Sequence, residues 1–127
     1  MKAFVAVIGI GVAMAAPAAG QQSVPLYKDL GNHHHKVSTV SVRAQQYFDQ
    51  GLKLAYGFNH AEAIRSFRAA QAADPNCAMC FWGEAFAFGP NINGAMDSAS
   101  AAAAFRAIQQ ARRLSSKATA KERAYIE

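Results

Sequence analysis

The stretch that decides the fold is AQQYFDQGLKLAYGFNHAEAIRSFRAAQAADPNC, residues 44–77. Small and apolar residues recur in it at spacings of three and four, which is the pattern of one buried face on an α-helix. A break at residues 57–60 separates two such faces, and Pro75 ends the second because proline cannot continue a helix. The stretch therefore predicts two helices joined by a short turn, which is an antiparallel hairpin.

The same stretch resembles a tetratricopeptide repeat, a helical hairpin of 34 residues. The matching positions are an aromatic, a small residue, a large apolar residue, an Ala-x3-Phe pair, a closing small residue and a proline: Tyr47, Gly51, Leu54, Ala63, Phe67, Ala70 and Pro75. Gln50 departs from the pattern, because leucine is usual there. The resemblance implies an all-α fold of stacked helical hairpins, a right-handed α-solenoid, in which Gly51 and Ala70 let helices approach closely.

A divergent second repeat is expected over residues 78–116. In its first helix Ala85 stands where Gly51 stood, and a loop rich in Gly, Pro and Asn follows. Asp97 or Ser98 then caps a second helix, with a buried face expected at Ala101, Phe105 and Ile108. The Ala-x3-Phe pair returns 38 residues after its first appearance, which places about four extra residues in the loop.

Residues 117–127 predict the start of a further helix, opened by a capping box between Thr119 and Glu122. Two repeats and the beginning of a third suggest part of a longer array, since such arrays usually need three or more repeats. The alternative is a compact two-repeat domain closed by a short C-terminal helix.

Residues 1–20 have the order of a secretory signal peptide: a positive start at Lys2, an apolar run and small residues near Ala18 and Gly20. This predicts an exported protein, periplasmic or secreted, with no other membrane contact; a retained membrane anchor is the alternative. Residues 21–43 read as an extended lead-in that contains three consecutive histidines, and Ser41 or Thr39 caps the helix that follows.

The charge pattern argues against nucleic-acid binding. The chain carries 13 basic and 8 acidic residues, a net charge of +5, but the basic residues are scattered and form no stripe. No Ser/His/Asp arrangement, phosphate-binding glycine loop or carboxylate pair is present, so we expect a binding scaffold rather than an enzyme.

The resemblance also implies where a protein or peptide partner binds, because the family uses the concave face of its first helices. The matching positions here form an aromatic and apolar surface: Gln45, Phe48, Leu52, Tyr56, Met79, Trp82 and Phe86. Such side chains make good anchors for an apolar peptide or a flat ligand. The alternative is that the lead-in folds back and fills this surface itself.

Cys77 and Cys80 stand three residues apart at the start of a predicted helix, within disulfide range. A structural or labile disulfide is the preferred interpretation, and two buried thiols are the alternative. A second hypothesis for function is a metal- or haem-binding accessory or redox protein, which would add the four histidines to this pair for zinc, copper or haem: His33, His34, His35 and His60. Solvated histidines in a polar loop are the simpler interpretation of this run, and no cofactor is then expected.

Overall fold

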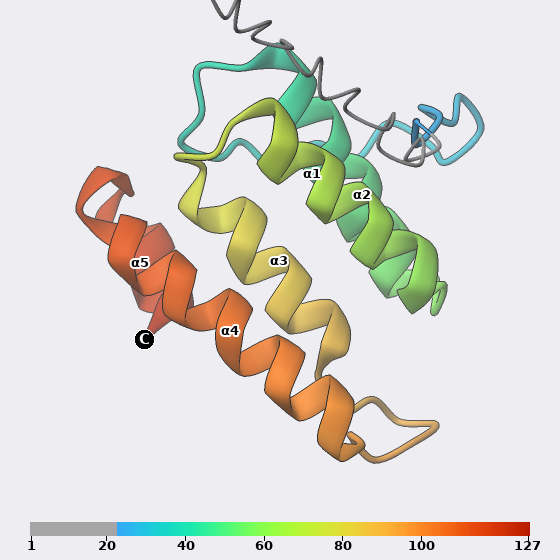
Figure 1. The fold of residues 1–127 in the computed structure, drawn as a ribbon. Coiled ribbons are helices and arrows are strands. Elements are labelled where there is room, and N and C mark those ends of the chain that lie inside the picture. The colour runs from blue at the N-terminus through green and yellow to red at the C-terminus, as the bar shows by residue number, and fades with distance from the viewer. Residues whose placement is uncertain (1–22) are drawn as a thin grey trace, which may run out of the picture.

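The computed structural model describes residues 23–127, and no β-strand occurs in that part of the chain. Five α-helices follow one another, with a 3₁₀ turn before the last (Figure 1). Their bounds are α1 Val42–Tyr56, α2 His60–Ala73, α3 Ala78–Phe88, α4 Ser98–Leu114, η1 Ser115–Lys117 and α5 Ala120–Ile126. The all-α prediction is confirmed for these residues, whereas the predicted signal peptide lies outside them.

Short polar side chains begin the helices as the sequence predicts. Ser41 rather than Thr39 caps α1, and Asp97 rather than Ser98 caps α4. Thr119 forms the expected capping box at the start of α5. Each cap satisfies a backbone N–H that the first helical turn leaves without a partner.

The helices pack in the order of the chain. α1 pairs with α2 and α3 pairs with α4, while α2 also packs on α3 (Figure 1). The centre of this packing is Phe67 on α2, which is completely buried. A Cβ atom would lie 2.8 Å from its ring at Gly51 and 2.3 Å at Gly83. The small residue expected at Gly51 therefore has the predicted role, and Gly83 on α3 has the same role without having been predicted.

The expected buried face of α4 is wrong at Ala101 and Phe105, which are exposed, whereas the third predicted residue, Ile108, packs against the core. Phe105, placed there by the Ala-x3-Phe spacing, is 62% exposed, whereas Ala107 and Ala111 are buried. α2 ends at a cap on Asp74 and α4 at a cap on Ser115, 41 residues later. In this register Ile108 and Ala111 correspond to Phe67 and Ala70, so the second unit is longer than the first by seven residues rather than four.

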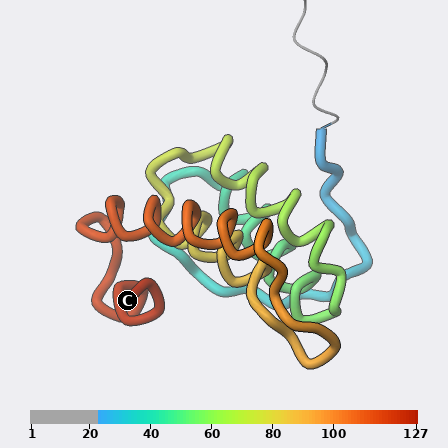
Figure 2. Tube along the Cα trace, turned by 60° about the horizontal axis from the view of Figure 1, so that its bottom comes forward, coloured from blue at the N-terminus to red at the C-terminus, as the bar shows by residue number. Residues whose placement is uncertain are grey.

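α5 does not continue the row of helices. In Figure 2 it is seen nearly along its own axis while α4 runs across the picture, so the two helices cross steeply. Its Ile126 is buried in the core, and Tyr125 contacts the ring of Trp82 on α3 with centroids 5.5 Å apart. α5 thus packs beside α3.

The lead-in wraps around α1 in two arms that meet at Gly31. We call residues 23–30 the outer arm and residues 32–39 the inner arm. Gly31 has a φ of 74°, which glycine adopts at little cost, and its carbonyl accepts a hydrogen bond from Lys53 near the end of α1. The outer arm approaches this bend along the side of α1 that faces α2, and the inner arm returns along the opposite side to the start of α1.

The outer arm packs against α1 on the N-terminal side of the first hairpin. Gln50 on α1 accepts from Tyr27 N at 2.8 Å and donates to Pro25 O at 2.9 Å and to Ser66 Oγ at 3.1 Å. Glu84 on α3, 34 residues further along, instead accepts from the side chains of Arg68 and Gln71 on α2. The carboxamide of Gln50 suits its own position because it has both a donor and an acceptor for the backbone of the outer arm.

Candidate functional site

An open groove of about 510 Å³ lies between the two hairpins, with the inner arm and α5 along its sides. Side chains from four segments line it: Leu30, His33 and His35; Phe48, Leu52, Lys53 and Tyr56; Met79 and Trp82; and Tyr125. Ligand pockets in proteins commonly enclose about 300–1,000 Å³ and are mostly apolar. The groove has the size and lining of a binding site.

Aromatic rings follow one another along the groove. Trp82 stacks on Phe86 with ring centroids 5.2 Å apart and planes 8° from parallel, and Tyr56 contacts Phe86 at 5.9 Å. On the other side Tyr125 lies 6.5 Å from His35, which in turn lies 6.2 Å from Phe48. The rings come from both hairpins, the inner arm and α5, so the surface exists only in the folded chain.

The rim of the groove is basic. This holds through one cation, Lys53, because the lining contains no other lysine or arginine and no carboxylate. Asp49, the nearest acidic residue on α1, is occupied by the inner arm: its Oδ2 lies 2.7 Å from His34 Nδ1 and its Oδ1 accepts from His35 N at 3.0 Å. An apolar ligand with a negative or carbonyl group at that rim therefore meets complementary charge.

The predicted partner-binding residues divide into three groups in the structure. Phe48, Leu52 and Met79 form the floor and are buried. Tyr56 and Phe86 are exposed and Trp82 is partly buried, and the ring of Phe86 contacts the other two. Gln45 does not face the open groove, because its side chain holds the inner arm. The lead-in consequently covers the α1 edge of the surface and leaves the rest open, which is intermediate between the two alternatives from sequence.

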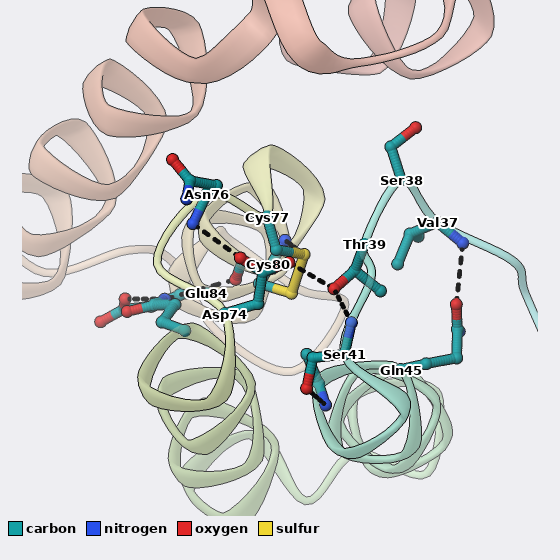
Figure 3. The surroundings of a disulfide bond; sticks show 12 residues. Val37, Ser38, Thr39, Ser41, Gln45, Asp74, Asn76, Cys77, Cys80 and Glu84 are labelled. Carbon is teal, nitrogen blue, oxygen red and sulfur yellow. Dashed lines mark hydrogen bonds between the residues drawn. A yellow bond between two sulfur atoms is a disulfide. The ribbon is translucent and has the colours of Figure 1, made fainter.

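Cys77 and Cys80 form a disulfide at the start of α3, with an S–S distance of 2.06 Å, so the preferred interpretation is confirmed. Both residues are completely buried. Figure 3 shows the disulfide between the end of α2 and the inner arm, where Thr39 donates to Asp74 and Asp74 O accepts from Cys77 N. Its burial argues for a structural bond rather than a catalytic one.

The histidines and cysteines do not assemble into a metal site. Residues 23–127 contain no group of three or more His, Cys, Asp or Glu side chains arranged to hold a metal ion. His34 pairs with Asp49, while His33 and His35 line the groove. His60 stands apart beside Phe58, and both its ring nitrogens are buried without a hydrogen-bond partner. Within residues 23–127, the alternative hypothesis of a site that joins both thiols to the histidines is not supported, because the disulfide uses both thiols.

Three residues have contacts to the lead-in or the groove that were not predicted from the sequence. Gln50 holds the outer arm, Tyr125 closes the groove, and Glu122 on α5 accepts from both the backbone N and the Oγ of Ser38 at 2.6 Å. Burial raises the pKa of Glu122, but the hydrogen bonds from Ser38 and Thr119 outweigh it, so the pKa is lowered overall. The unusual glutamine was the only signal in the sequence for any of these roles.

Comparison with protein-family models, curated proteins and solved structures gives no match. None of the helices in residues 23–127 is long and apolar enough to cross a membrane.

Proposed function

We propose that this protein is an exported scaffold of tetratricopeptide-like hairpins, a right-handed α-solenoid, that binds a protein or peptide partner in its aromatic groove. The residue pattern of 44–77 supports the family, and the packing of Phe67 between Gly51 and Gly83 is the close approach that the pattern implies. The apolar stretch near Lys2 supports export.

The observation that carries the binding function is that the groove stays open although the lead-in lies beside it. Apolar surface of this kind is rarely left bare without a role. Trp82 and Tyr56 come from different hairpins and contact the same ring, Phe86. Aromatic side chains in this arrangement are the usual anchors of a binding interface. We propose that an apolar or aromatic side chain of the partner packs against Tyr56 and Trp82 from the groove, which both residues line.

Trp82 also supplies the test, because it is the only tryptophan of the chain. Peptides selected from a random library on the full chain should shift its fluorescence as they bind. Tyr56→Ala should weaken the binding of the selected peptides at least about tenfold, which corresponds to about 1.4 kcal/mol. Phe48 is unsuitable for such a test, because it is completely buried and its replacement would destabilise the fold.

The matched control is Phe105→Ala, which removes an exposed aromatic from α4 outside the groove. Its binding constants should equal those of the unmodified chain. Peptides that bind without moving the Trp82 emission, and equally well to Tyr56→Ala, would contradict the proposal.

A further inference from the structure

The two arms of the lead-in are held as bound peptides are held. Gln45 donates from Nε2 to His35 O at 2.9 Å and accepts at Oε1 from Val37 N at 3.0 Å. Gln50 makes the same pair of bonds to Pro25 O and Tyr27 N. In both cases one carboxamide bonds the carbonyl of a residue and the N–H two positions later. A carboxamide has the donor and acceptor of a peptide group, so each glutamine stands in for a neighbouring strand.

The side chains of the inner arm add selectivity to these backbone contacts. Val37 is buried in the core, and the hydroxyl of Ser38 donates to Glu122 on α5. Thr39 donates its hydroxyl to Asp74 at the end of α2. The site therefore accepts an extended segment in which a small aliphatic residue precedes two hydroxyl residues.

The link between this bound segment and α1 is short and exposed. Val40 is fully solvent-exposed and lies between Thr39, the last residue of the inner arm, and Ser41, the cap of α1. If the chain straightens at Val40, residues 23–39 move away from their own α1 as a unit. All the bonds described above can then form again with a second copy, because that copy offers the same glutamines and carboxylates.

We propose that α1, α5 and the end of α2 form a docking site for an extended segment, and that two copies of this chain exchange residues 23–39 between these sites. An exchanged segment makes the same contacts as before, so the cost is mainly the loss of freedom on association. This proposal does not depend on which ligand the open groove binds, but the exchanged segment supplies Leu30, His33 and His35 of the groove lining.

Deletion of Val40 tests the exchange, because a shorter link prevents the inner arm from turning back onto its own α1. We expect the full chain without Val40 to be a dimer by light scattering, with its helical circular dichroism retained. Deletion of Ile92, which is exposed in the loop between α3 and α4, should leave the mass unchanged. A monomeric Val40 deletion that keeps its helix content would overturn the proposal.

A second test does not depend on the deletion. A fluorescent peptide of residues 23–40 should enter the site of the full-length chain, followed by anisotropy. N-methylation at Tyr27 and Val37 removes the two clamped N–H groups, and we expect it to weaken the peptide at least about tenfold. N-methylation at Lys28 and Lys36 should not weaken the binding, because Gln45 and Gln50 bond the N–H groups of Val37 and Tyr27 instead. Equal binding of both methylated peptides, or no binding of the unmodified one, would refute the site, whereas Tyr56→Ala should leave this binding unchanged.

Discussion

The two hairpins of this molecule have the same plan and differ in how completely they are covered. The α1–α2 hairpin lies between the lead-in and α3, and Phe67 at its centre is completely buried. The α3–α4 hairpin has α2 on one side and only the short α5 near its other end. There the single phenylalanine of α4, Phe105, is 62% exposed. Neighbouring elements, rather than a spacing of apolar residues, therefore decide which face of a helix is buried.

The largest expected effect separates the two phenylalanines. Phe67→Ala should lower the free energy of unfolding by about 3–5 kcal/mol, because it leaves a cavity between α1, α2 and α3. Phe105→Ala should change it by less than about 0.5 kcal/mol, as for most exposed positions. Urea unfolding followed by circular dichroism measures both. Similar losses in the two variants would mean that α4 is buried on the face predicted from sequence.

A second effect concerns the junction of the hairpins. Replacing both Cys77 and Cys80 by serine removes the bond that closes the first turn of α3 but keeps a hydroxyl at the helix cap. The loss should be about 2 kcal/mol on the chain-entropy account of a short loop. Reduction of the unmodified chain should give the same shift in its urea midpoint. If reductant has no effect on the native chain while the serine variant is weakened, the serines and not the missing bond are responsible.

The close contact of Phe67 with α3 gives the next effect. Gly83→Ala places a methyl group against the ring, and overpacking of this kind costs about 1–3 kcal/mol. The better helix propensity of alanine offsets at most about 1 kcal/mol of this cost. Thermal unfolding should therefore show a net loss, which Phe67→Leu in the same chain reduces. Gly94→Ala is the control, because no atom lies within 4 Å of the added Cβ; a stabilised Gly83→Ala would show that the helices are not in close contact.

The smallest effect is the cap of α4. Ser100 donates from its backbone N and its hydroxyl to Asp97, which holds the pKa of this carboxyl below its ordinary 3.8. Its stabilising effect is fully present above pH 3.8 and is lost as the pH falls through the lowered pKa. Asp97→Ala should remove this part of the acid dependence of the melting temperature, whereas Asn59→Ala, at the cap of α2, should keep it. Identical acid profiles for Asp97→Ala and the unmodified chain would assign the acid dependence to other carboxyls.

Much of the first hairpin could be predicted from the sequence, because several independent features of residues 44–77 indicate the same two helices. The spacing of Tyr47, Gly51 and Phe67, the break at residues 57–60 and Pro75 all point to the same two helices. In α4 the signals conflict: residues 101–104 are all alanine, so several registers place a small residue against α3. The prediction therefore relied on Phe105 to choose the buried face of α4, and that choice was wrong because Phe105 is exposed.

The site was predictable in part for a related reason. The floor of the groove was predicted from the resemblance, which implies that Phe48, Leu52 and Met79 lie on the inner face of the first helices. The contributions of Tyr125 and Glu122 depend on the steep crossing of α5, and no local pattern encodes that angle. Each arm is held by hydrogen bonds from individual side chains of α1, mainly Gln50 for the outer arm and Gln45 for the inner arm. Only the unusual glutamine at position 50 indicated such a contact in the sequence.

The spacing of the two cysteines has a consequence for how α3 begins. With 11 residues, α3 is shorter than the roughly 12–15 residues that an isolated helix needs to persist in water, since nucleation of the first turn is its most costly step. A covalent ring from residue 77 to residue 80 confines that turn through residues that are close in sequence, without a contribution from distant parts of the chain. Once oxidised, α3 has a nucleus of its own, onto which the preceding hairpin can dock.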